Sequence, residues 1–133
     1  MSRDRWRDPA AHDAVFLDRL NIDTVIGIHP HEQTAPQPLR LSLRMGFDNR
    51  RPAVSDDLAD TLDYAAIATR LRAHAQGRAW RLIETLAESC ADLLHAEFGV
   101  RRLWLRIDKP QAVPEAESVG VEIQRRWNDG RAG

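Results

Sequence analysis

The longest amphipathic run of the sequence, residues 82–98, places the strongest limit on the fold. Its apolar side chains recur every three or four positions, as they do along one face of a helix: Ile83, Leu86, Ala87, Cys90, Leu94 and Phe98. A helix with one broad apolar face buries that face against another element. We therefore expect a helix that ends at Gly99 and packs on a sheet or on a second helix.

A second helix and a long strand are predicted before this run. Residues 64–76 repeat the helical spacing, with Asp63 as the expected N-cap and Gly77 as the end. Residues 14–28 are rich in branched apolar side chains, which are typical of a strand, and we expect a bulge at residues 21–23.

Strict alternation of apolar with polar or small side chains marks the other strands. The apolar positions are Leu39, Leu41, Leu43, Met45 and Phe47, then Leu103, Leu105 and Ile107, and last Val119, Val121 and Ile123. Residues 29–38, with three prolines, and residues 48–63, rich in aspartate, are predicted to be loops. The order ββααββ predicts an α+β fold in which two helices cover one face of a four-stranded antiparallel sheet.

Length and composition indicate one domain. The 133 residues contain no internal repeat, so we expect a single domain over residues 14–126, a loosely ordered extension over 1–13 and a frayed tail over 127–133. A formal net charge of −1 argues against nucleic acid or an anionic membrane as a partner. The single cysteine, Cys90, lies on the apolar face of the predicted helix, and no apolar run reaches the roughly 20 residues of a membrane span. We expect a soluble, cytoplasmic protein without disulfides.

The predicted sheet is open and has two unpaired edges. Its second face also carries polar and aromatic side chains such as Trp104 and Arg106. Joining edges in an oligomer would satisfy the unpaired backbone groups. The alternative is a monomer whose edges are guarded by Arg101, Arg102 and Arg125.

Four side chains able to act as acids, bases or anchors stand at the ends of predicted elements: Glu32, Tyr64, Glu84 and Lys109. Element ends and loops are where binding and catalytic sites are usually built. Glu84 lies in the first turn of the helix over residues 82–98, beside its apolar face. There it either stabilises the helix dipole or binds a ligand that presents two parallel N–H donors, because a carboxylate accepts both in a charge-assisted pair.

Two other chemistries rest on less complete patterns. His29 and His31 project to the same side of an extended segment, but zinc needs a third ligand, and nothing in the sequence brings one near. One predicted strand carries basic and aromatic side chains of the kind that bind single-stranded nucleic acid: Arg101, Arg102, Trp104 and Arg106. The alternative is a solvated or interface strand. Without a third ligand we expect no metal site, and with no basic excess in the chain we expect no nucleic-acid partner.

Seven short motifs follow one another along the chain. They are Ile26-Gly27-Ile28 followed by Glu32, Gln37-Pro38-Leu39, Ser55-Asp56-Asp57-Leu58, Leu62-Asp63-Tyr64-Ala65, Leu82-Ile83-Glu84-Thr85-Leu86-Ala87-Glu88, Asp108-Lys109-Pro110 and Val119-Gly120-Val121-Glu122-Ile123. In this order and spacing they resemble the dihydroneopterin aldolase family, over about residues 14 to 126. The succession is far more specific than any single motif.

The resemblance implies a fold, an assembly and a pterin-binding wall. The family has the tunnelling fold, in which four subunits join their sheets into a barrel and two such rings stack as a homo-octamer. By motif, Glu84 would hold the amino group and the adjacent ring N–H of the pterin, with help from backbone groups near Leu82 and Ile83.

The resemblance also implies the residues that act on the substrate side chain. Lys109 and Tyr64 would move protons, with Tyr64 contributed by a neighbouring subunit, and Glu32 would lie near the substrate hydroxyls. The reaction would be the retro-aldol cleavage of dihydroneopterin to hydroxymethyl-dihydropterin and glycolaldehyde in folate biosynthesis, with epimerisation of the side chain as a second outcome. Because the substrate's own ring imine accepts the electrons of the broken bond, this chemistry implies no cofactor and no metal.

Two other functions stay open at this point. Dihydroneopterin triphosphate epimerase has the same fold and catalytic set, and a non-catalytic oligomeric binding module is the further alternative. One segment departs from the family pattern, because His29-Pro30-His31 replaces the aromatic and acidic residues that commonly precede the loop glutamate. Contacts to the substrate side chain are therefore expected to differ.

Overall fold

A computed structural model describes residues 13–128 of the chain. The predicted N-terminal extension, apart from Asp13, and residues 129–133 of the predicted tail lie outside the described residues. None of the helices in the described part is long and apolar enough to cross a membrane.

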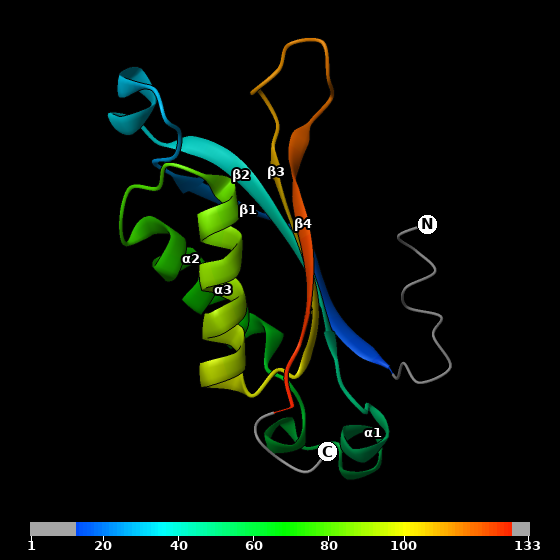
Figure 1. The fold of residues 1–133 in the computed structure, drawn as a ribbon. Helices are drawn as coiled ribbons and strands as arrows, with labels where there is room; N and C mark the ends of the chain where they lie inside the picture. Colours follow the sequence, from blue (N-terminus) through cyan, green and yellow to red (C-terminus); the bar gives the residue numbers. More distant parts are fainter. Residues whose placement is uncertain (1–12, 129–133) are drawn as a thin grey trace.

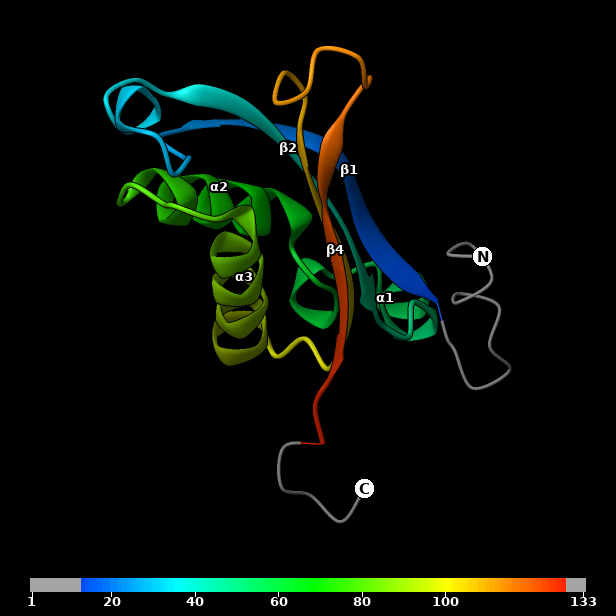
Figure 2. The same cartoon turned by 45° about the horizontal axis from the view of Figure 1, so that its top comes forward.

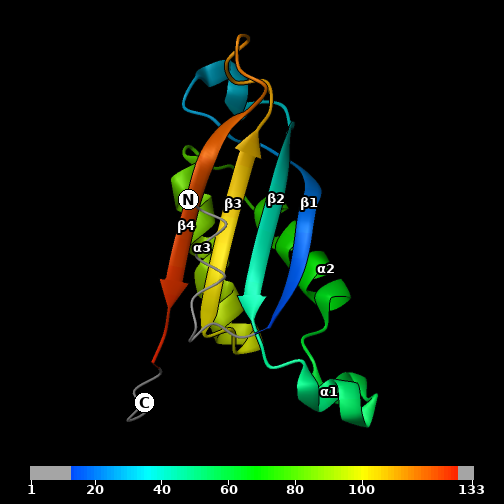
Figure 3. The same ribbon diagram turned by 90° about the vertical axis from the view of Figure 1, so that its right-hand side faces the viewer.

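A single antiparallel sheet forms the centre of the molecule. Its strands are β1 (Ala14–Thr24), β2 (Gln37–Gly46), β3 (Arg102–Lys109) and β4 (Val119–Arg126). They lie side by side in the order β1-β2-β3-β4, as Figure 3 shows. The predicted α+β arrangement with a four-stranded antiparallel sheet is therefore confirmed.

Two long helices cover one face of this sheet (Figures 1 and 2). Helix α2 spans Tyr64–Gln76 and helix α3 spans Ile83–Phe98, in agreement with the sequence pattern. The Asp63 carboxylate accepts a hydrogen bond from the Ala66 N–H at 3.1 Å and so acts as the predicted N-cap of α2. Helix α3 ends at Gly99, which has a φ of 70°.

The core lies between the sheet and the helices. The apolar side chains of β2 and β3 that alternate in sequence are almost fully buried: Leu39, Leu41, Leu43, Met45, Leu103, Leu105 and Ile107. They meet the buried faces of α2 and α3, which include Ile67, Leu71, Leu86 and Leu94. Burying one such leucine or isoleucine contributes about 1.5–3 kcal/mol relative to leaving it exposed, so this layer fixes both helices on the sheet.

The first strand differs from its prediction at both its bulge and its end. The register with β2 shifts between Leu17 and Leu20, not at residues 21–23. Arg19, within this irregularity, has a φ of 58°, and its N–H donates to Ser42 Oγ at 3.0 Å. The strand stops at Thr24 instead of Ile28, because the chain then leaves β2 and bridges to Trp80.

Both predicted loops contain short helices. The segment before β2 holds the 3₁₀ turn η2 (Pro30–Gln33), and residues 48–63 hold α1 (Arg50–Ser55) and η3 (Leu58–Asp60). Aspartate side chains start the last two: Asp48 accepts the Arg50 N–H at 3.0 Å, and Asp57 accepts the Ala59 N–H at 3.0 Å. The aspartates that marked a loop therefore accept backbone N–H groups at the starts of these short helices.

Trp127, assigned to the tail in the sequence analysis, is held by the domain. Its N–H donates to the Arg101 carbonyl at 2.9 Å, and its ring stacks on His95 with 4.6 Å between centroids.

Candidate functional site

The segment after β1 places Glu32 beside the sheet. Beyond Thr24 the chain forms an isolated parallel bridge in which the Trp80 N–H donates to the Val25 carbonyl and the Gly27 N–H donates to the Trp80 carbonyl, each at 2.9 Å. The turn η2 follows, with Pro30 at its start, where a missing N–H costs nothing. Glu32 is the third residue of this turn.

The Glu32 carboxylate is held by three donors. Lys109 Nζ, at the end of β3, lies 2.8 Å from Glu32 Oε2, and these side chains are only 15% and 14% exposed. The His29 N–H donates to Oε1 at 3.2 Å, and Gln37 Nε2 donates to Oε2 at 3.3 Å. The hydrogen bond from Lys109 and then those from His29 and Gln37 lower the pKa of Glu32 from 4.5 to about 2, so it is ionised at neutral pH.

Gly27 makes room for this carboxylate. Its φ is 139°, a conformation that side-chain-bearing residues rarely adopt, and a Cβ added there would lie 2.2 Å from Glu32 Cδ. The glycine of the Ile26-Gly27-Ile28 motif is therefore required by both the backbone and the packing of Glu32.

The first turn of α3 forms the wall opposite Glu32. Glu84 lies in this turn, as predicted, and is exposed. The N-cap is Leu82, whose side chain offers no hydrogen-bond acceptor, so no side chain caps the first N–H groups of the helix. A carboxylate and uncapped N–H groups together provide both acceptors and donors on one wall.

A pocket of about 290 Å³ joins the two walls. Figure 1 shows that η2, the start of α3 and the β3–β4 connection lie at the same end of the molecule. The pocket is lined by Ile26, Gly27, Ile28, His29, Glu32, Arg81, Leu82, Ile83, Glu84, Lys109 and Ala112. One wall thus offers a carboxylate for paired N–H donors, and the other offers an ammonium–carboxylate pair for hydroxyl groups.

Five of the six residues proposed from the sequence line this pocket, and Tyr64 does not. Tyr64 starts α2, at the end of that helix away from the α2–α3 connection, and is 59% exposed. The sequence reasoning missed Arg81 and Ala112 as pocket residues. Arg81 immediately precedes the recognised Leu82–Glu88 motif, and this adjacency was the signal available for it.

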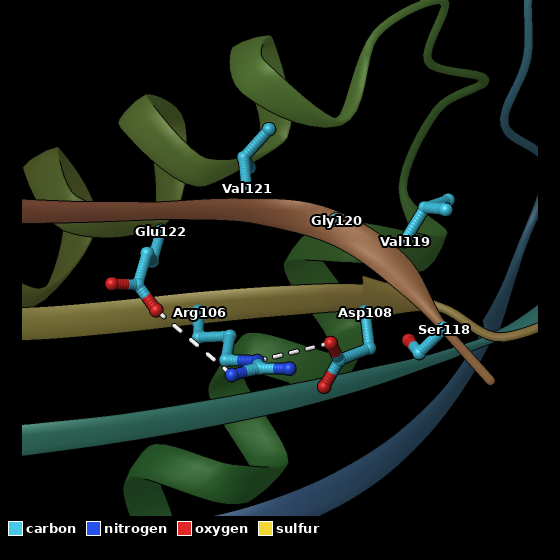
Figure 4. Close-up of a pocket in the computed structure, with 7 residues that line it drawn as sticks. All are labelled: Arg106, Asp108, Ser118, Val119, Gly120, Val121 and Glu122. Carbon is cyan, nitrogen blue, oxygen red and sulfur yellow. Dashed lines mark hydrogen bonds and ion pairs between the residues drawn. The ribbon is translucent and has the colours of Figure 1, made fainter. Parts of the chain in front are cut away.

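A second hollow, of about 230 Å³, lies on the face of the sheet away from the helices (Figure 4). Arg106 sits between Asp108 and Glu122, with nitrogen–oxygen distances of 3.0 and 4.0 Å. One guanidinium is thus paired with two carboxylates, and no residue proposed for the pterin site lines this hollow. The same ion pairs engage Arg106, one of the side chains considered for nucleic-acid binding.

The zinc alternative based on His29 and His31 finds no third ligand in the described part of the chain, and Cys90 is not a reactive thiol. The His29 and His31 rings stack at 5.7 Å on the surface, and within residues 13–128 no group of three His, Cys, Asp or Glu side chains could hold a metal ion. Cys90 is buried, and burial raises the pKa of its thiol to about 12, which removes it as a nucleophile at neutral pH.

Comparison with known proteins gives one consistent result. The sequence model of the family described as "FolB: Dihydroneopterin aldolase" matches residues 15–124. A dihydroneopterin aldolase of Escherichia coli K12 is 42% identical over 116 residues, which are 87% of this chain and 95% of the relative.

Solved structures agree with the sequence relatives. A Vibrio cholerae structure described as a putative dihydroneopterin aldolase has a TM-score of 0.86 at 41% identity and covers 88% of this chain and 99% of its own. The E. coli dihydroneopterin aldolase in complex with neopterin has a TM-score of 0.82 at 42% identity, covering 85% and 98%.

Proposed function

This chain belongs to the dihydroneopterin aldolase family, and we propose that the pocket between η2, the first turn of α3 and the end of β3 is its active site. The protein is a carbon–carbon lyase of folate synthesis, and its relatives do not favour the epimerase. The observation that supports the site is the meeting of Glu32, Glu84 and Lys109, distant in sequence, around one pocket.

Glu84 anchors the pterin in this proposal. The aminopyrimidine edge of a pterin presents an amino group and a neighbouring ring N–H, which match the two oxygens of a carboxylate in a forked pair. Leu82 and Ile83, which line the pocket beside Glu84, add backbone groups and apolar contact to the ring. The neopterin bound in the E. coli structure is a ligand of this chemical class.

Lys109 and Glu32 act on the side chain of the substrate. A base removes the proton of the chain hydroxyl, the carbon–carbon bond next to it breaks and releases glycolaldehyde, and the electron pair moves into the ring imine. The ring nitrogen takes a proton to form an enamine, which then gains a proton at carbon and loses the one at nitrogen to give hydroxymethyl-dihydropterin. The proton removed from the hydroxyl is thereby returned at carbon. Lys109, through water, and Tyr64 move these protons, and the ionised Glu32 accepts hydrogen bonds from the substrate hydroxyls while it holds Lys109 in place.

The active site is completed by a neighbouring copy, which supplies Tyr64. The chain offers two open sheet edges for such an assembly, β1 and β4. We propose a ring of four copies closed through these edges, two of which stack as a homo-octamer.

Direct assay tests the reaction. Purified protein is incubated with dihydroneopterin in the presence of a chelator, and glycolaldehyde and hydroxymethyl-dihydropterin are measured. We expect both products in equal amounts. Loss of turnover with the chelator and its return with zinc would disprove the metal-free mechanism, and turnover of the triphosphate alone, to its epimer, would establish the epimerase.

Subunit mixing tests the shared site. Tyr64→Phe and Glu84→Ala proteins, each confirmed to be nearly inactive, are unfolded, mixed in equal amounts and refolded together. If each site draws these two residues from different chains, about a quarter of the sites regain both after random assembly. A site built within one chain always lacks one of them, so proven mixing without recovered activity would refute the shared site.

A further inference from the structure

We propose that Gln33 is a positioning residue for this site, whose side-chain amide fixes the wall that carries Glu32 relative to the wall that carries Glu84. The inference rests on the function proposed above for the pocket. Gln33 is the last residue of η2 and follows Glu32 directly. It does not line the pocket, so it acts through residues that do.

The amide nitrogen of Gln33 donates to two backbone carbonyls, those of Gly27 and Trp80, the second at 3.0 Å. A primary amide has two N–H donors and so satisfies both acceptors together. Gly27 belongs to the segment that leaves β1, whereas Trp80 belongs to the α2–α3 connection, 47 residues beyond Gln33. One side chain therefore joins the loop of Glu32 to the connection that leads into Glu84.

Trp80 is a rigid attachment point for this bond. Its side chain is 2% exposed, and its indole N–H donates to the Ala75 carbonyl at 2.8 Å. Its backbone is paired with Val25 and Gly27 in the parallel bridge. Because Trp80 is set in the core four residues before Glu84, a loop tied to its carbonyl is placed relative to the start of α3.

The other contacts of Glu32 do not perform this task. Its carboxylate is bound by His29, Gln37 and Lys109, which belong to its own loop, to β2 and to β3. These bonds orient the carboxylate but do not reach the α2–α3 connection. The parallel bridge and the bond from Thr24 Oγ1 to the Ala75 carbonyl join the two walls before the η2 turn begins. Without the Gln33 amide, the turn that carries Glu32 would lose its own bond to the α2–α3 connection, and small displacements of reacting groups are costly for catalysis.

Variants of Gln33 separate donor loss from other effects. Gln33→Met keeps the length of the side chain but has no donor, whereas Gln33→Lys supplies donors to the same carbonyls. Thr34→Val is the matched control, because Thr34 Oγ1 donates to the His31 carbonyl at 3.0 Å within the same loop and, among residues 13–128, has no hydrogen bond to another element. For each variant we would measure kcat and KM with dihydroneopterin, the melting temperature, and Kd for neopterin and for pterin without a side chain.

Gln33→Met is expected to lower kcat/KM by about 10- to 100-fold. It should weaken the binding of neopterin, which touches both walls, more than the binding of plain pterin, which needs only the Glu84 wall. Gln33→Lys should recover most of both losses, and Thr34→Val should match the wild type. Gln33→Asn, whose amide is one methylene shorter, should give an intermediate loss and provides the test if Gln33→Met does not fold.

Two results distinguish this inference from the proposed function. If Gln33→Met, or Gln33→Asn in its place, changes only the melting temperature and leaves kcat/KM and the ratio of the two Kd values unchanged, the amide is merely structural and the inference is wrong. If the wild type binds pterins but does not cleave dihydroneopterin, the proposed function fails, and the ratio of Kd values still decides the role of Gln33.

Discussion

Replacement of Gly27 by alanine tests whether the position of Glu32 controls activity. The new Cβ would lie 2.2 Å from Glu32 Cδ and 2.3 Å from Oε1, whereas ordinary contacts begin near 3.4 Å. The carboxylate must therefore move by more than an ångström. Since Lys109 Nζ is 2.8 Å from Glu32 Oε2, such a shift disrupts their ion pair and the geometry of the pocket wall.

The substitution has two separable effects. A φ of 139° strains any residue other than glycine, and we expect a loss of about 1–3 kcal/mol in the free energy of unfolding. The displaced carboxylate should in addition lower kcat/KM by about 100-fold, because a misplacement of an ångström can cost this much. Urea unfolding and steady-state kinetics with dihydroneopterin measure the two effects.

Gly99→Ala is the matched control for strain without a clash. Gly99 has a φ of 70°, and a Cβ there would meet nothing within 4 Å. Its replacement should cost about 1–2 kcal/mol of stability and leave kcat/KM unchanged. If Gly27→Ala loses stability as Gly99→Ala does but keeps wild-type kcat/KM, the argument that Gly27 protects the position of Glu32 is refuted.

Three further predictions concern single side chains. Glu84→Ala should weaken pterin binding by about 2–4 kcal/mol in a titration, while Lys109→Ala should spare binding and abolish turnover. The control is Glu88→Ala, four residues along α3. Normal pterin binding by folded Glu84→Ala would mean that Glu84 only stabilises the helix dipole. Lys109 and its neighbours hold the pKa of Glu32 at about 2, so the ionised Glu32 should stabilise the fold fully above pH 4.5 and lose this effect as the pH falls toward 2. In urea unfolding, the difference in free energy of unfolding between the wild type and Glu32→Gln should shrink over that range. A difference that stays constant with pH would contradict this prediction. Cys90, with its pKa raised to about 12 by burial, should react with a thiol reagent at pH 8 only after unfolding.

The sequence by itself determined the helices and strands of this protein and placed its candidate site residues at the ends of these elements. Helical spacing located both long helices and alternation located β2, β3 and β4, because these periods report which side chains face the core, whereas β1 was located by its branched apolar residues. Asp63, Gly77 and Gly99 marked the helix ends, because capping depends on backbone chemistry within a few residues. Glu84 at the start of α3 and Lys109 at the end of β3 followed from the same patterns.

Only the tertiary structure decided how these residues meet. The bulge of β1 lies at residues 17–20 and not at 21–23, because register depends on cross-strand partners such as Ser42, which alternation does not specify. The pair of Glu32 and Lys109 joins groups 77 residues apart. Gln33 gave no periodic or motif signal of its role, since its partners are two backbone carbonyls that become neighbours only when the α2–α3 connection packs beside the end of β1.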